Sequence, residues 1–265
     1  MPKTITVHYY VKNDLEMLSA TAADWITSAA EQAIAARGVA RIAISGGNTP
    51  RRTFELLADP AQPFRQRIDW PRLQLFWVDE RCVSPEDKDS NYRMTRETLL
   101  SKVPLPEANI VRMEGELDPE EAASRYESAL RNKFRLEGAE LPRFDLVLLG
   151  MGDDGHTASL FPHSAGLDSM MRLAIANHVE AKNSWRITLT WPVINHASSV
   201  FFLIQGASKA DVLRNVLLGP YQPEQYPSQL IRPESGELRL LLDATAAAKL
   251  PLPGSDGTGV LELTR

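Results

Sequence analysis

The sequence predicts an α/β fold built on a doubly wound, mostly parallel sheet with helices on both faces. Three observations support this prediction: short apolar runs bounded by glycine or proline, segments with helical spacing of apolar residues, and regular alternation of the two along the chain. Buried parallel strands are continuous apolar runs because helices cover both faces of the sheet. In this fold class, ligands bind beyond the carboxyl ends of the strands.

The composition fits one large domain, residues 1–265, because 43% hydrophobic content supplies a sizeable core. The 29 basic and 34 acidic residues provide no basic field for binding nucleic acid or an anionic membrane. Cys82 is the only cysteine, so no intramolecular disulfide can form. No signal sequence opens the chain, and no apolar run approaches the ~18 residues of a membrane span. We expect a cytoplasmic protein, either a monomer or a small homo-oligomer.

The first half of the chain alternates strand and helix. Residues 4–11 are β-rich and alternate in polarity, and the alanine-rich segment 13–37 has helical spacing and ends before Gly38. Apolar runs predict strands at 39–44 and 73–78. A short helix is predicted after the 45–50 loop, ending at Ala58, and a second from 91 to 102, before Pro104. A third is predicted from Asp118 to about 136, with Pro119 and acidic residues in its first turn.

The second half continues the alternation after a buried strand at 144–149. Strands are predicted at 173–179, 186–190, 199–205 and, as the last, 238–242, and helices at 191–197, 206–218 and 244–249. The glycine- and proline-containing tail is expected to be loosely held, apart from residues 260–263. Residues 219–236 are rich in proline, glutamine and tyrosine, and predict a long surface loop.

The loop at 45–50 resembles a phosphate site in outline. Gly46 and Gly47 expose backbone N–H groups, Asn48 follows, Thr49 is a candidate N-cap, and Pro50 suits the first helical position. Free donors and a positive helix end then point at one place. An ordinary glycine turn between strand and helix is an equal alternative.

The loop at 150–162 follows the strand at 144–149 and gathers Asp153, Asp154 and His156 among three glycines. Its spacing also matches the Gly-x-Gly-x-x-Gly dinucleotide fingerprint. Against that interpretation, the two aspartates place negative charge where a pyrophosphate would bind, and Pro162 interrupts the helix that should follow. A tight strand-to-helix turn with an acidic cap is the remaining alternative.

Two further strand ends carry charged groups. Asp79 and Arg81 alternate and are expected to share a face, although a salt bridge at the strand end is an alternative. Lys209 is placed in the first turn of a helix, where the dipole disfavours a cation unless an anion is present; the alternative is a solvated lysine.

Four loops at one sheet edge predict a ligand site. His156, His163 and the aspartates lack recognisable metal-ligand spacing, and we expect no cofactor.

Five motifs lie between residues 45 and 210: Ser-Gly-Gly-Asn-Thr-Pro, Trp-Val-Asp-Glu-Arg, Ser-Asn-Tyr, Gly-Met-Gly-Asp-Asp-Gly-His-Thr-Ala-Ser-Leu-Phe-Pro and Gly-Ala-Ser-Lys-Ala. In this order they resemble the 6-phosphogluconolactonase family. The resemblance implies a NagB-like α/β fold and hydrolysis of 6-phospho-D-glucono-1,5-lactone to 6-phosphogluconate in the oxidative pentose phosphate pathway.

The resemblance also implies roles for individual residues. His156 corresponds to the proposed general base, Asp154 to the acid beside it, and Arg81 and Lys209 to cationic substrate contacts. Gly47, Asn48 and Thr49 correspond to the phosphate-facing loop. Asp153 departs from the small residue or proline often found at its position, and adds negative charge near the site.

Two other functions compete with lactone hydrolysis. In related glucosamine-6-phosphate deaminases, a glutamate paired with the shared histidine assists ring opening, and this sequence has Phe161 at that position. An apolar side chain cannot move protons, so we favour the hydrolase. A non-catalytic sugar-phosphate sensor attached to a DNA-binding module is disfavoured by the chain's acidity and by a strand that begins at Thr4.

Overall fold

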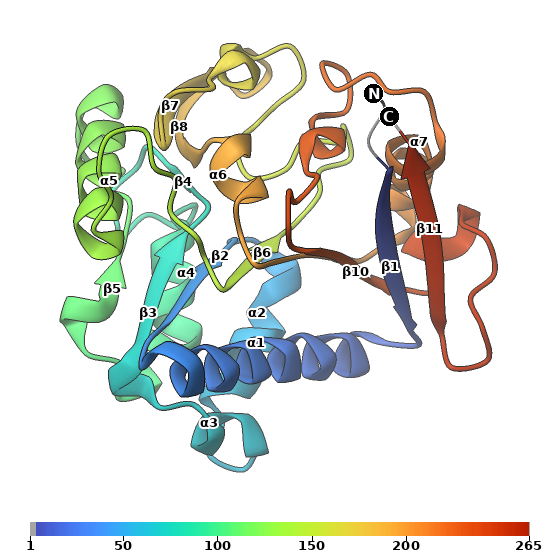
Figure 1. Ribbon diagram of the computed structural model, residues 1–265, viewed down its shortest axis with the longest axis horizontal. Coiled ribbons are helices and arrows are strands. Elements are labelled where there is room, and N and C mark those ends of the chain that lie inside the picture. The colour runs from blue at the N-terminus through green and yellow to red at the C-terminus, as the bar shows by residue number, and fades with distance from the viewer. Residues whose placement is uncertain (1–3, 265) are drawn as a thin grey trace.

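The computed structural model describes residues 4–264, which form an eight-stranded central sheet and a three-stranded second sheet, with helices on both faces of the central one (Figure 1). All neighbouring strands of the central sheet pair in parallel except β1 and β11, and this confirms the predicted fold class. The central sheet has the order β11 (Thr258–Thr264), β1 (Thr4–Lys12), β10 (Glu237–Asp243), β9 (Ser199–Ile204), β6 (Leu146–Leu149), β2 (Ala40–Ile44), β3 (Leu73–Trp77) and β5 (Ile110–Val111).

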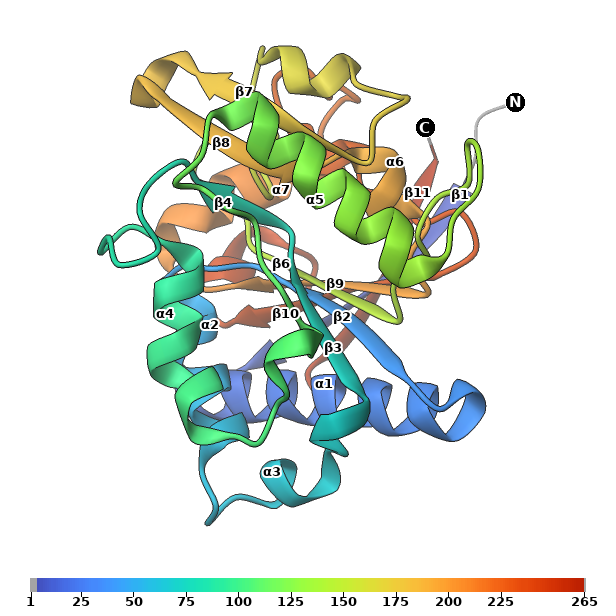
Figure 2. The same ribbon diagram turned by 90° about the vertical axis from the view of Figure 1, so that its left-hand side faces the viewer.

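Two hydrophobic clusters fill the space on the two faces of this sheet. Alternate residues of one strand enter different clusters: Leu146 and Leu148 join one, and Val147 and Leu149 join the other. The first face is covered by α1 (Leu15–Arg37), α2 (Asn48–Ala58), α3 (Pro63–Arg67) and α4 (Asn91–Thr98). The opposite face is covered by α5 (Pro119–Phe134), α6 (Trp191–Asn195), α7 (Ala210–Leu218) and the second sheet (Figure 2).

The predicted helix starts and stops follow from local chemistry. The Asp14 carboxylate accepts a hydrogen bond from the Met17 N–H and caps α1, which ends at Gly38 with φ 77°. Asp118 caps α5 in the same way, with Pro119 in the first turn as predicted. The N-terminus of α2 is different: the helix starts at Asn48 after Gly47, so the prediction that Thr49 is the N-cap was wrong.

The second sheet was not predicted. It consists of β4 (Asp79–Arg81), β8 (Ser184–Leu189) and β7 (Ala174–Val179), all antiparallel. The chain changes sheets at Val78, whose N–H bonds to Ile44 O in β2 while its carbonyl accepts from Leu189 N at the end of β8. Asp79 and Arg81 therefore belong to a strand rather than to a loop, and they share one of its faces as expected.

Smaller differences concern short segments. The predicted helix at 91–102 ends at Thr98 and is followed by a 3-10 turn at Leu100–Lys102. The predicted surface loop at 219–236 contains a 3-10 turn, Pro227–Leu230, in which Ser228 and Gln229 are buried. Across residues 4–264, no helix combines the length and the apolar character needed to cross a membrane.

The parallel sheet places functional loops at one edge and the chain ends at the other. Strands β9, β6, β2 and β3 are consecutive neighbours, so the loops that follow them emerge together. At the amino edge, Thr4 of β1 lies opposite Thr264 of β11. The carboxyl edge therefore carries the candidate site, and the amino edge carries both ends of the described chain.

Candidate active site

A cavity of about 260 Å³ opens at the carboxyl edge of the central sheet, where the four predicted loops meet. The side chains and backbone that line it include eight of the nine residues singled out from the sequence: Gly46, Gly47, Asn48, Thr49, Asp79, Arg81, His156 and Lys209. The ninth, Asp154, lines a neighbouring cavity and contacts His156. The convergence predicted from the strand ends is thus confirmed, whereas the roles of these residues stay predictions.

His156 and Asp154 form a close pair. Asp154 Oδ1 lies 2.6 Å from His156 Nδ1 and also accepts a hydrogen bond from the His156 backbone N–H at 3.1 Å. Burial opposes ionisation of Asp154, but the hydrogen bond and charge of His156 outweigh it and lower the pKa of Asp154 to about 2. An ionised carboxylate only accepts hydrogen bonds, so Nδ1 carries a proton, and in the neutral imidazole Nε2 then has a free lone pair.

The glycines of this loop make room for the pair. A Cβ atom at Gly152 would lie 2.0 Å from His156 Nδ1 and 2.6 Å from Asp154 Oδ1. The Gly152 N–H donates to the His156 carbonyl oxygen at 2.9 Å and closes the turn. These contacts account for the glycine at position 152 without a dinucleotide, because the space beside it is taken by two side chains.

The opposite part of the cavity is suited to an anion. Helix α2 begins there after Gly47, which has φ 99°, and no side chain caps it, so its first N–H groups are available to a ligand. The Lys209 ammonium also lines the cavity, and it pairs with Asp153 Oδ1 at 2.5 Å. Asp153, the residue that departs from the family pattern, therefore neutralises a cation of the site.

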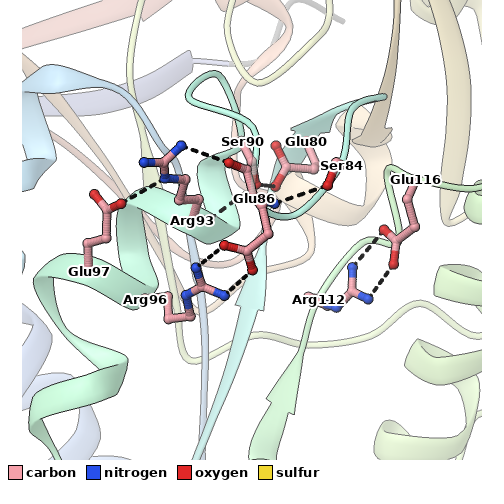
Figure 3. A network of polar contacts seen from close by, with 9 residues as sticks. All are labelled: Glu80, Ser84, Glu86, Ser90, Arg93, Arg96, Glu97, Arg112 and Glu116. Atoms are coloured by element: carbon pink, nitrogen blue, oxygen red, sulfur yellow. Dashed lines mark hydrogen bonds and ion pairs between the residues drawn. The ribbon is translucent and has the colours of Figure 1, made fainter.

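Glu80 holds the polar wall of the cavity in place. Its buried carboxylate accepts hydrogen bonds from the backbone N–H groups of Arg81, Asn91 and Tyr92 and from the Ser90 hydroxyl, at 2.7 to 3.0 Å. These contacts tie the end of β4 to the start of α4. Figure 3 shows the surrounding ion pairs, in which Glu86 of the 83–90 loop contacts Arg96 and Arg93 contacts Glu97.

Two residues of this region were not predicted by direct reasoning from the sequence. Asn91 lines the cavity and donates from Nδ2 to the Asp79 carbonyl oxygen at 2.9 Å; only the Ser-Asn-Tyr motif pointed to it. Arg186 of β8 lies directly opposite Arg81 of β4. Burial, and then the charge of Arg81, lower the pKa of Arg186 from its usual value. No sequence signal joins these two arginines, because they are 105 residues apart in the chain (186 − 81).

The fold and the cavity together define a doubly wound α/β protein with a small-molecule site, in which a histidine–aspartate pair faces a region suited to an anion. Within residues 4–264, no group of three or more His, Cys, Asp and Glu side chains is arranged to hold a metal ion.

Comparison with known proteins agrees with this class. The family model described as glucosamine-6-phosphate isomerases/6-phosphogluconolactonase matches residues 13–240. A 6-phosphogluconolactonase of Synechocystis sp. is 45% identical over 226 residues, which cover 85% of this chain and 90% of the relative. The chain belongs to the glucosamine-6-phosphate isomerase/6-phosphogluconolactonase family.

Solved structures give the same result. The 6-phosphogluconolactonase from Trypanosoma cruzi superposes with a TM-score of 0.78 at 30% identity, covering 91% of this chain and 96% of that one. A monomeric glucosamine-6-phosphate deaminase of the NagB superfamily reaches a TM-score of 0.75 at 19% identity, covering 91% of this chain and 99% of that one. The second likeness shows the fold alone, which is the NagB-like fold that the motifs implied.

Proposed function

We propose that this protein hydrolyses 6-phospho-D-glucono-1,5-lactone to 6-phosphogluconate, with His156 as the general base. The observation that supports this most is the position of His156, paired with Asp154, in the same cavity as the uncapped N-terminus of α2, Arg81 and Lys209. One part of the cavity is suited to moving a proton, and the other to binding a phosphate.

The chemistry follows from the pair's geometry. A lactone is an activated ester, so a water molecule can attack its carbonyl carbon directly if a base removes a proton. His156 Nε2 takes that proton while the water oxygen bonds to the carbon, and Asp154 stabilises the imidazolium through Nδ1–H. Backbone N–H groups of the loops stabilise the oxyanion. The ring C–O bond then breaks, and His156 returns the proton to the leaving oxygen.

The phosphate supplies binding energy and selectivity. Charge-assisted hydrogen bonds from Arg81 and Lys209 contribute about 1.5–3 kcal/mol each. In the free protein Lys209 already has Asp153 as a partner, so the substrate must share or displace that carboxylate. The protein should therefore bind the phosphorylated lactone more tightly than plain gluconolactone. The difference in affinity should be smaller than in a site where neither Arg81 nor Lys209 had a carboxylate partner.

Phe161 supports hydrolysis over deamination. The resembling deaminases carry a glutamate at the position of Phe161 and pair it with the histidine for ring opening, whereas here that position holds a phenyl ring stacked on the His156 imidazole. We also propose that residues 1–265 form a single domain and that the protein is cytoplasmic, as a monomer or a small homo-oligomer.

The decisive experiment follows disappearance of the phosphorylated lactone with and without protein, against its spontaneous hydrolysis at the same pH. We expect acceleration without added metal or nucleotide, and an unchanged rate in EDTA. An unaccelerated reaction would refute the proposal. Loss of activity in EDTA and its return with zinc would refute the metal-free mechanism while keeping the reaction.

A further inference from the structure

The face of the His156 ring is covered by a second ring. The Phe161 phenyl stacks on the imidazole with 4.0 Å between ring centroids and 21° between planes. Phe161 is buried, at 7% exposure, and lines the neighbouring cavity, whereas His156 lines the catalytic one. The imidazole is therefore held at its Nδ1 edge by Asp154 and on one face by Phe161, and the rest of the ring is left to the catalytic cavity.

A tight turn brings these two rings together although they are five residues apart. Thr157 and Leu160 form an isolated antiparallel bridge, with Leu160 N–H donating to the Thr157 carbonyl at 2.9 Å. Between them, Ala158 adopts φ 48°, a left-handed conformation that a residue with a Cβ atom seldom takes. Such a conformation persists only where the surrounding structure determines it, and it is frequent at active sites.

The surrounding contacts do determine it. The Thr157 hydroxyl donates to the Gly150 carbonyl at 2.8 Å, which fixes the start of the turn. The Ser159 hydroxyl donates to the Asp79 carboxylate at 2.7 Å, which ties the middle of the turn to β4. Beyond the turn, the Phe161 carbonyl accepts from both the N–H and the hydroxyl of Ser164. The backbone that carries Phe161 is thus fixed on both sides.

We propose that Phe161 is a positioning residue for the base, and that its ring preferentially stabilises His156 once it has accepted the proton of water. The negative face of an aromatic ring attracts a cation more than a neutral ring, so the stack strengthens as the imidazolium forms. An interaction that is stronger in the transition state than in the ground state raises kcat. This inference rests on the proposed function, since it assigns the partner of the proposed base.

The kinetic test compares Phe161→Leu, which removes the aromatic face, with Phe161→Tyr, which keeps it. We expect kcat for the phosphorylated lactone to fall about 5- to 30-fold in the Leu variant, from the size of a partly desolvated cation–π contact. KM should stay within about twofold, because Phe161 does not line the catalytic cavity. The Tyr variant should retain most of the activity. Phe144→Leu, the same change at a core phenylalanine before β6, controls for general loss of packing.

Three outcomes would overturn the inference: a normal kcat in Phe161→Leu, a Tyr variant as slow as the Leu variant, or an equal fall in Phe144→Leu. If the wild-type protein itself fails to hydrolyse the lactone, the proposed function is refuted, and the inference then depends on a second measurement that needs no turnover.

That measurement is the proton NMR spectrum of the histidine rings. A phenyl ring stacked at 4.0 Å should shift the ring C–H signals of His156 upfield. His156→Asn assigns these signals among the five histidines. The upfield shift should disappear in Phe161→Leu and remain in Phe161→Tyr. Signals that do not respond to Phe161 would overturn the stacking, whatever the enzymatic result.

Discussion

At the scale of single residues, two consecutive carboxylates of the 150–155 loop serve different partners. Asp153 Oδ1 pairs with the Lys209 ammonium and accepts from the Ser208 hydroxyl, whereas Asp154 Oδ1 pairs with His156 Nδ1. Side-chain exposure separates them as well: 68% for Asp153 and 47% for Asp154. The ion pair of Asp153 with Lys209 is therefore screened by solvent and can be replaced by a ligand. The contact of Asp154 with His156 Nδ1 instead determines which ring nitrogen of the proposed base carries the proton.

Replacing His156 by Asn should lower kcat by about 10²- to 10⁴-fold, since the amide can hold a polar contact but has no basic nitrogen. The melting temperature and the competitive binding of 6-phosphogluconate should change little. Turnover near the wild-type value would exclude His156 as the base. A joint loss of melting temperature and product binding would instead assign it to the shape of the loop.

Asp153→Asn should strengthen binding of the phosphorylated lactone, because Lys209 loses a competing carboxylate. An exposed ion pair contributes about 0.2–1 kcal/mol, so KM should fall by up to about fivefold at low salt, and less at 0.5 M NaCl. Plain gluconolactone provides the internal control, since it has no phosphate to gain from the change. A KM that falls equally for both lactones would show that Asp153 acts on the loop rather than on the charge of Lys209.

At the scale of elements, Glu80 joins β4 to the start of α4. Burial raises the pKa of Glu80 against the opposing effect of the Tyr92, Asn91 and Arg81 N–H donors. A carboxyl group whose pKa is raised by folding stabilises the fold most when it is protonated. This stabilisation is complete below the unfolded pKa of about 4.3 and is lost as the pH rises through the higher folded value.

Glu80→Gln should destabilise the protein, because the amide turns N–H donors toward backbone N–H groups. We expect faster hydrogen exchange at residues 90–93 and weaker activity, since Asn91 and Arg81 lose their support. The free energy of unfolding of the wild-type protein should exceed that of Glu80→Gln by more as the pH falls from 7 toward 4, because only Glu80 can become protonated. A difference that narrows over this range would contradict the sign of the Glu80 shift.

The Arg81–Arg186 juxtaposition belongs to the pairing of β4 with β8. Like charges directly opposite each other destabilise an antiparallel pair. Arg186→Gln should therefore raise the melting temperature in phosphate-free buffer while reducing the stabilisation gained on adding inorganic phosphate. Arg214→Gln on α7 serves as the control for loss of one positive charge, because Arg214 lies outside the β4–β8 pair. Equal phosphate responses in wild type and Arg186→Gln would exclude Arg186 from anion binding.

The sequence predicted the elements whose pattern is local, and missed those defined by distant partners. Periodicity and caps were sufficient for α1, α5 and the long parallel strands. The two-residue strand β5 and the three-residue strand β4 carry no periodicity, so their pairing could not be predicted. In the site, the loop residues next to strand ends were found, because the parallel fold brings those ends together. Asn91 and Arg186 were missed by direct reasoning, because they reach the region from other elements.

At the scale of the whole molecule, the last strand of the described chain is the edge strand of the central sheet next to β1. Strand β11 pairs with β1 from Thr4↔Thr264 to Tyr10↔Thr258 and so covers an edge that would otherwise present unpaired N–H and C=O groups. Three strands, β1, β10 and β9, separate it from β6, whose carboxyl end leads into the His156 loop.

A chain that stops at Pro253 should therefore keep its catalytic geometry but lose solubility. We expect a kcat within about threefold of the full chain in freshly prepared, dilute samples. Concentration-dependent aggregation should appear in size-exclusion chromatography as the uncovered β1 edge pairs with other molecules. A truncated protein that is inactive yet monomeric and folded would show that β11 contributes to the site at a distance.

Thr4 and Thr264 lie side by side at the amino edge of the sheet, whereas the cavity opens at the carboxyl edge. A support, a label or a second enzyme attached at either end would therefore project away from the cavity mouth. Immobilisation through either end should leave the entrance open to the lactone, and in a fusion with an enzyme that makes this lactone the two active sites would not face each other. In such a fusion, the intermediate would have to diffuse around the sheet.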